Sequence, residues 1–218
     1  MSAEKIRIAI IDTQTMLAES LTEILNREPD FTVIGHATDG ESGLQLCRAS
    51  NPHLVLVDVA LKKINGCALI DLLRGEFPAL RVIVISGTVD PYTVWRVSRS
   101  EPQGFLEKSS PLRNLLATIR SVASGTDSFS PYYQAIKNDW LSQPVAFHKI
   151  LSKREREVLL RAVAGQPDEQ IGKELEIRKT TVCVHRKNIR AKLRLHNDRG
   201  LIAYARIWGL DSRANEMV

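Results

Sequence analysis

Two kinds of hydrophobic pattern divide the chain. Up to about Ser124, short runs rich in Ile and Val alternate with segments whose apolar residues recur every three or four positions. The runs are IRIAII, FTVIGHA, LVLVD, RVIVIS and GFLE, and the helical segments that follow them are 16–27, 40–49, 66–76, 91–100 and 111–124. The third and fourth runs are almost wholly apolar, which is typical of strands buried on both faces. The pattern predicts an α/β fold, a (βα)5 doubly wound parallel sheet.

The pattern changes after Ser124. Residues 125–149 mix Gly, Ser, Pro and aromatic residues without either period, which predicts a linker with room for a short helix. From Leu151 onward no strand pattern is present, and helices are predicted at 153–165, 168–175, 180–193 and 199–208. Ser152 and Glu155 have the spacing of a capping box, and Gly165 is suited to end the first of these helices. The predicted organisation is therefore a domain at 1–124, a linker at 125–149 and a second, all-α domain at 150–218.

Composition is that of a globular protein that stays in the cytoplasm. Apolar residues make up 44% and charged residues 25% of the 218 residues. No apolar run is long enough to cross a bilayer, and the first residues lack the pattern of a signal peptide, so no membrane partner is expected. Three cysteines without a CxxC pair, Cys47, Cys67 and Cys183, predict neither a disulfide framework nor a zinc site.

The positive charge is concentrated in the C-terminal part. Residues 1–125 carry 13 Lys and Arg against 14 Asp and Glu, whereas residues 150–218 carry 15 against 9. A local basic excess of this kind favours polyanions such as nucleic acid as partners. A solvated basic surface without a partner is the alternative on charge alone.

The third of the C-terminal helices has the pattern of a DNA-recognition helix. Seven Lys and Arg and no acid lie between Arg178 and Arg194. Helices of about 8 and 14 residues joined by a short turn fit the helix-turn-helix plan, in which the second helix enters the major groove. An inward stripe is predicted at Val182, His185, Ile189 and Leu193, and the outward positions are Cys183, Val184, Lys187, Arg190 and Arg194.

The segment from Leu151 to Leu210 resembles the DNA-binding domain of the NarL/LuxR family of bacterial regulators. The resemblance rests on LSKREREVL, the IGKEL of the preceding helix, TVCVHRKNIRAKL and a last helix that ends in GL. It implies that base reading falls on Cys183, Val184 and Lys187, and that the last helix pairs two copies into a homodimer. The predicted contacts to double-stranded DNA are Thr180, Thr181, Cys183, Val184, Arg186, Lys187, Arg190 and Lys192. Cys183 departs from the family, where a lysine is frequent, so selectivity is expected to depend on Val184 and Lys187.

Polar residues end four of the predicted strands. Asp12 follows the first strand, Asp58 ends the third, Ser86 the fourth, and Lys108 follows the fifth. Carboxyl ends of parallel strands meet at one edge of the sheet, where open α/β folds place their sites. Taken singly, Asp58 is also suited to cap a helix and Lys108 to be a surface charge.

Together these residues resemble the receiver domain of two-component response regulators, over about 120 residues. The resemblance implies that Asp58 accepts a phosphoryl group from a phosphohistidine of a sensor histidine kinase. Lys108 would pair with the phosphoryl oxygens, and Ser86 and Phe105 would be the switch positions. Mg²⁺ would be held by Asp12, Asp58 and the carbonyl of Ala60, and would neutralise charge on the transferring group.

Two departures from the receiver pattern bear on the metal. Thr13 follows Asp12 where a second acid is usual, and Leu61-Lys62, with Lys63 next, replaces the usual Met-Pro. The affinity for Mg²⁺ is expected to be lower. The two lysines would either offset the lost metal charge partly or point into water.

The sequence thus predicts a DNA-binding transcription regulator of a two-component phosphorelay, controlled by phosphorylation of Asp58. The alternative is an atypical regulator or adaptor that acts without phosphorylation, through heterodimer contacts. Redox control through Cys183 is a third hypothesis. An enzyme is not predicted, because an aspartate-dependent phosphatase needs a second Asp where Ala60 stands, and the glycines at 35, 40 and 43 do not form a nucleotide-binding motif.

Overall fold

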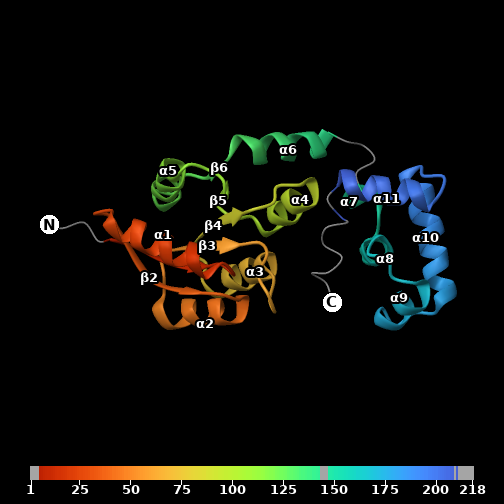
Figure 1. Ribbon diagram of the computed structural model, residues 1–218, viewed down its shortest axis with the longest axis horizontal. Helices are drawn as coiled ribbons and strands as arrows, with labels where there is room; N and C mark the ends of the chain where they lie inside the picture. The colour runs from red at the N-terminus through yellow and green to blue at the C-terminus, as the bar shows by residue number, and fades with distance from the viewer. Residues whose placement is uncertain (1–4, 143–146, 209, 211–218) are drawn as a thin grey trace. The chain divides into compact units, whose positions relative to one another are not determined.

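The chain folds into two compact units, each with its own core. The computed structural model describes residues 5–142, 147–208 and 210 (Figure 1). The first unit comprises residues 1–89 and 93–135, and the second comprises residues 90–92 and 136–218. The predicted boundaries at 124 and 150 stay a prediction. No helix of the described residues combines the length and the apolar character that crossing a bilayer requires.

The first unit is a parallel sheet of six strands in the order β2-β1-β3-β4-β5-β6. The strands are β1 (Ile6–Ile11), β2 (Phe31–Ala37), β3 (Leu54–Asp58), β4 (Arg81–Ser86), β5 (Gly104–Glu107) and β6 (Ser128–Phe129). The helices between them are α1 (Thr15–Arg27), α2 (Gly40–Ser50), α3 (Gly66–Glu76), α4 (Pro91–Ser100) and α5 (Leu112–Ala123). The predicted doubly wound α/β fold is confirmed, and the first five strands have the predicted bounds.

Alternating side chains of the central strands cover both faces of this sheet. Even-numbered residues of β1 and β3 pack with α1 and α5 in one core cluster, which includes Ile8, Ile10, Leu54, Leu56, Leu21, Leu25, Leu115 and Ile119. The intervening residues Ala9, Ile11, Val55 and Val57 are buried on the opposite side. Helices α2 and α3 contact each other there, α2 against β1 and β2 and α3 against β3. Burial on both faces explains the continuous apolar runs of the sequence.

A sixth strand and a helix lie in the segment that the sequence predicted as a linker. β6 continues the sheet beside β5, with Ser128 N donating to Gln103 O at 2.9 Å and Ser130 N to Phe105 O at 3.0 Å. α6 (Pro131–Ser142) follows at once. A strand of two residues is too short to show a period of two, so its pairing with the open edge of β5 was not evident in the sequence.

The second unit is helical, as predicted. Its helices are α7 (Phe147–Ile150), α8 (Lys153–Val163), α9 (Asp168–Glu174), α10 (Lys179–Leu193) and α11 (Asp198–Ile207), and the four predicted helices agree with α8 to α11 to within two residues. The capping box of Ser152 and Glu155 is present at the start of α8. The core is formed by Val158, Leu159, Ile171, Val182, Ile189, Leu193, Leu201, Ala205 and Trp208.

A tight turn joins α9 to α10. Gly172 of α9 is buried, and a Cβ there would lie 2.7 Å from the carbonyl oxygen of Ile177. Ile177 N donates to Gly172 O at 2.9 Å, and Glu176 takes a left-handed conformation with φ +54°. Because only glycine leaves room for the turn at this close approach, Gly172 sets the distance between the two helices.

Candidate functional site

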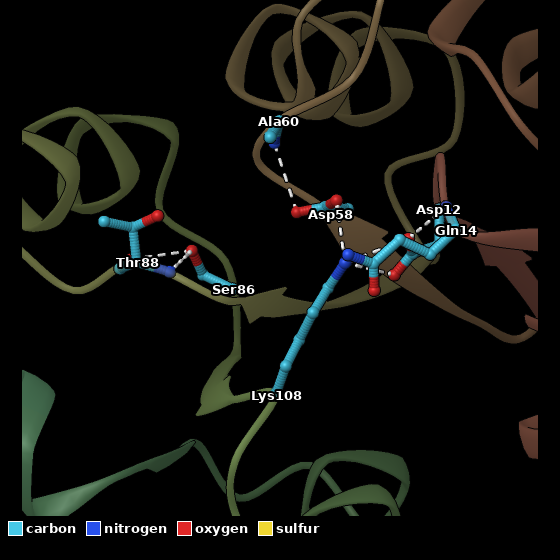
Figure 2. A network of polar contacts seen from close by, with 7 residues as sticks. All are labelled: Asp12, Gln14, Asp58, Ala60, Ser86, Thr88 and Lys108. Carbon is cyan, nitrogen blue, oxygen red and sulfur yellow. Dashed lines mark hydrogen bonds and ion pairs between the residues drawn. The ribbon is translucent and has the colours of Figure 1, made fainter. Parts of the chain in front are cut away.

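The first candidate site is an acidic pocket at the carboxyl edge of the sheet. Neighbouring parallel strands β1 and β3 bring Asp12 and Asp58 together, and both are buried, with exposures of 2% and 4%. Lys108 follows β5, and its Nζ lies 2.9 Å from Asp12 Oδ1 and 2.9 Å from Asp58 Oδ2 (Figure 2). One ammonium therefore bridges two buried carboxylates, and the three groups together carry a charge of −1.

Backbone N–H groups also donate to one oxygen of each carboxylate. Gln14 N donates to Asp12 Oδ1 at 2.8 Å, and Ala60 N donates to Asp58 Oδ1 at 3.1 Å. Bonds of this kind, from a backbone N–H to the side chain two residues before it, fix the loops that leave the strands. Both carboxylates are thereby held in place before any ligand binds.

Gly66 shapes the loop behind Asp58 and was not recognised as a site residue. A Cβ at position 66 would collide with the carbonyl oxygen of Asp58, and Gly66 N donates to Val59 O at 3.1 Å. The loop thus folds back onto the end of β3, and only glycine permits that approach. The Asn65-Gly66 pair at the start of α3 is the signal in the sequence that marks such a turn.

Ser86 lies at the same edge but does not contact the acidic cluster. Its Oγ donates to Thr88 O at 2.7 Å and accepts from Thr88 N at 3.2 Å. Figure 2 shows the Ser86 and Thr88 side chains on the far side of Asp58 from Asp12. The structure therefore brings Asp12, Asp58 and Lys108 together, and leaves Ser86 bonded to its own loop.

Phe105 is fully buried beneath an aromatic stack. Its ring lies 4.6 Å from that of Tyr133 on α6, and the Tyr133 ring lies 5.2 Å from that of Phe129 on β6. Ser130 Oγ donates to Glu107 Oε1 at 2.5 Å, which adds a polar tie between β5 and the start of α6. Tyr133 is 1% exposed, and its burial raises the pKa of the phenol to about 12. The switch position predicted from the sequence is thus covered by residues 128–133.

The donor set of the pocket fits a magnesium ion with few protein ligands. Asp12 Oδ2 is buried and accepts no hydrogen bond within the described structure, although Lys108 Nζ lies 2.8 Å away. Mg²⁺ prefers oxygen ligands and usually keeps several waters, so two carboxylates suffice for a site. Thr13 adds no charge, and no group of three His, Cys, Asp or Glu suited to a metal occurs among the described residues. Binding weaker than at a pocket with three acids is expected.

Lys63 pairs with acidic side chains at the start of α2, and its own side chain is 60% exposed. Its Nζ lies 3.2 Å from Asp39 Oδ2 and 3.6 Å from Glu41 Oε2, at the start of α2. The hydrogen bond from Ser42 N, together with Lys63, lowers the pKa of Asp39. Both lysines are exposed, and Lys63 in addition pairs with α2.

The second candidate site is α10. Val182, Ile189 and Leu193 are buried in the domain core, and His185 is half-buried on the same side. Thr180, Cys183, Val184 and Lys187 are exposed, and Thr181 is half-buried. Val184 is 55% exposed, which suits contact with a thymine methyl group in the major groove.

Most basic side chains of α10 are paired within the domain. Arg186 contacts Asp168 and Asp198, Arg190 contacts Asp198, Lys179 contacts Glu169, and Lys192 contacts Glu155. Among the described residues, Lys187 has no ion-pair partner. Among the basic side chains of α10, Lys187 is therefore the one that is open to a ligand, one turn from the exposed Val184.

Cys183 is held as a thiol. Its Sγ donates to Asp168 Oδ2 at 3.2 Å, and this bond to a carboxylate raises the pKa of the cysteine. The thiolate is the reactive form, so its fraction at neutral pH is reduced. The geometry does not favour the redox hypothesis.

Two families match the two parts of the chain. The response regulator receiver domain matches residues 8–120, and the bacterial regulatory proteins of the luxR family match residues 149–205. The chain is 29% identical to the transcriptional regulatory protein MctR of Rhizobium johnstonii, over 96% of this chain and 97% of that protein. It is 30% identical to the transcriptional regulatory protein DegU of Brevibacillus brevis, over 91% and 92%. With the nitrate/nitrite response regulator protein NarL of Escherichia coli it shares 28% identity, over 88% and 91%.

Solved structures share the fold. RcsB from Salmonella enterica serovar Typhimurium, bound to promoter rprA in the presence of phosphomimetic BeF3⁻, superimposes with a TM-score of 0.65 at 20% identity, over 92% of this chain and 98% of that one. The response regulator ChrA of a heme-sensing two-component system gives a TM-score of 0.55 at 24% identity, over 94% and 98%. The chain is therefore a response regulator of the NarL/LuxR family, a transcription regulator that joins a receiver domain to a LuxR-type helix-turn-helix DNA-binding domain.

Proposed function

We propose that phosphorylation of Asp58 by a sensor histidine kinase controls the binding of this regulator to DNA. The observation that carries the proposal is the contact of Lys108 Nζ with two buried carboxylates, Asp12 and Asp58, at one edge of the sheet. A fixed ammonium beside a carboxylate nucleophile is suited to bind the oxygens of an incoming phosphoryl group.

The reaction uses few groups of the protein. An oxygen of Asp58 forms a bond to phosphorus while the P–N bond of the phosphohistidine breaks, and the leaving imidazole takes a proton from solvent. Lys108 passes from the carboxylates to the phosphoryl oxygens. A magnesium ion held by Asp12, Asp58 and the carbonyl of Ala60 would neutralise further charge. Ser86 reaches the new phosphoryl group only after its bonds to Thr88 break, and that exchange, with Phe105, would be the switch.

The output would be made by α10 and α11. Val184 and Lys187 would read bases, while Thr180 and Thr181 would contact phosphates. On α11, Ile202 is 43% exposed, and an exposed apolar residue on the last helix supports pairing of two copies into a homodimer. The cytoplasmic location stays a prediction.

Phosphorylation is tested with acetyl phosphate and Mg²⁺ on the full chain. A mass increase of one phosphoryl group that is lost on hydroxylamine treatment is expected for the wild type, and none for Asp58→Asn. Asp71→Asn, which changes an exposed aspartate on α3, is the control and should be phosphorylated like the wild type. An equal mass increase in Asp58→Asn would overturn the assignment.

A second variant tests the weakened metal site. Thr13→Asp restores the acid that receiver domains usually carry, so half-maximal phosphorylation should occur at a lower Mg²⁺ concentration than in the wild type. If Thr13→Asp leaves the Mg²⁺ dependence unchanged, the missing acid does not limit metal binding.

Regulation without phosphorylation is the second candidate. It is favoured by the pairing of Lys108 with both carboxylates and of Ser86 with Thr88, an arrangement that is complete without a phosphoryl group. In that case acetyl phosphate leaves no label on the chain, and the affinity for DNA selected from random sequence is the same with and without it.

A further inference from the structure

Two arginines of α10 are held in ion pairs within the DNA-binding domain. Arg186 Nη1 lies 2.7 Å from Asp168 Oδ1, and Arg186 Nη2 lies 2.9 Å from Asp198 Oδ2. Arg190 Nη1 lies 2.6 Å from the other oxygen of Asp198. Two carboxylates thus form ion pairs with two guanidinium groups in the middle of the recognition helix.

These four side chains come from three helices of the DNA-binding domain. Asp168 begins α9, Asp198 begins α11, and the arginines lie on successive turns of α10. Figure 1 labels the three helices. All four line one open groove. The side chains of Arg186 and Arg190 are only 19% and 30% exposed. In these ion pairs the two guanidinium groups lie in the groove and are directed at the carboxylates.

Stability alone does not account for the two ion pairs made by Asp198. Asp198 is half exposed, and ion pairs with an exposed partner contribute little to the free energy of folding. Their effect on the charge presented to DNA is larger, because sequence-independent binding depends on the number of phosphates that free cations neutralise. An arginine paired with a carboxylate does not contribute to that number unless the pair breaks.

We propose that Asp168 and Asp198 are specificity-determining residues, which withhold Arg186 and Arg190 from DNA phosphates and so limit binding to random sequence. Lys187 and Val184 keep their access to base edges, and the ratio of specific to nonspecific affinity rises. The inference rests on DNA binding by α10 and is independent of phosphorylation at Asp58.

The test compares full-length wild type and Asp198→Asn by fluorescence anisotropy. One duplex has random sequence, and the other carries the site that the wild type selects from a random library. Asp198→Asn should bind the random duplex about three- to tenfold more tightly, with a smaller gain on the selected site. The slope of log affinity against log salt should steepen by about 0.9 for each arginine that reaches a phosphate.

Three further variants make the result specific. Glu174→Gln removes a carboxylate that pairs with Arg161 on α8, so it reports the effect of net charge alone and should change binding less. Asp198→Glu keeps the charge and should resemble the wild type. Arg186→Gln added to Asp198→Asn should reverse much of the gain on random DNA, because it removes one of the released cations.

Two results would overturn the proposal. If Asp198→Asn binds both duplexes more weakly, the carboxylates orient the arginines toward DNA and do not withhold them. If Asp198→Asn and Glu174→Gln change binding equally, only net charge matters. Should Asp198→Asn unfold at the assay temperature, Asp168→Asn gives the comparison for Arg186 alone, because Asp198 still pairs with Arg190.

Discussion

Lys187 differs from its basic neighbours in having no carboxylate partner among the described residues, and it lies one turn from the exposed Val184. Lys187→Ala should therefore weaken binding to the selected DNA site by about tenfold or more, and binding to random DNA much less, since base contacts contribute discrimination. Anisotropy with both duplexes measures the two effects.

Lys173→Ala is the control for Lys187→Ala. Lys173 is an exposed lysine on α9, so its loss changes the net charge equally at a different place. If both variants lose the same affinity on the selected duplex as on the random duplex, Lys187 attracts the DNA backbone only.

At the residue scale, the sequence predicted which residues form the acidic cluster, but it did not predict the hydrogen bonds of Ser86 beside the cluster. Asp12, Asp58 and Lys108 could be placed together because each follows a parallel strand. The bond of Ser86 to Thr88 depends on a side-chain rotation within a loop, which no periodicity reports. The pairing of Arg186 with Asp168 and Asp198 joins three helices and required the packed domain.

At the scale of the elements, the stability of α8 depends on Glu155 in its first turn. Glu155 is 4% exposed and accepts bonds from Ser152 N at 2.7 Å and from Lys192 Nζ at 2.8 Å. Burial alone would raise the pKa of Glu155, but Lys192 and the Ser152 backbone outweigh it and lower the pKa. The ionised carboxylate therefore stabilises the folded state.

The pH dependence of Glu155 follows from this sign. The ionised Glu155 adds to the free energy of unfolding above the pKa of an unfolded glutamate, about 4.3. This contribution is lost as the pH falls through the lower pKa of the folded state. Glu155→Gln should lower the free energy of unfolding at about pH 7 and have less effect at about pH 4. Urea unfolding of both proteins at each pH measures the difference, and a difference independent of pH would contradict the assignment.

The aromatic stack at α6 makes a second element-scale prediction. Tyr133 is buried against Phe105, whereas the adjacent Tyr132 is 58% exposed. Tyr133→Ala should destabilise the receiver domain by about 3 to 5 kcal/mol, and Tyr132→Ala should have little effect. Similar midpoints of chemical unfolding for the two variants would show that the stack is not part of the receiver core.

Residues 128–133 contain the strand and the aromatic contact that the sequence did not predict. Strands and helices with a clear period were placed to within two residues. β6 is stabilised by an edge partner, β5, and Tyr133 by a ring far away in sequence, so both depend on tertiary contacts that a local pattern does not contain.

For the whole molecule, two separate cores predict two unfolding transitions. The receiver core is built from the sheet with α1 and α5, and the second core from α8 to α11. In calorimetry, Tyr133→Ala should shift one transition and Ser152→Ala, which removes the cap of α8 at a cost of about 1 kcal/mol, should shift the other. If each variant shifts both transitions together, the two units unfold as one.

The burial of the cysteines has a practical consequence at this scale. Cys47 and Cys67 are buried, and burial raises the pKa of Cys47 to about 11, while Cys183 is exposed on α10. A maleimide dye or spin label will therefore react with the native chain at Cys183, faster as the pH is raised. The wild-type protein thus carries a single reactive cysteine on the helix surface that we propose contacts DNA, and protection of that cysteine would report the bound state without any engineered substitution.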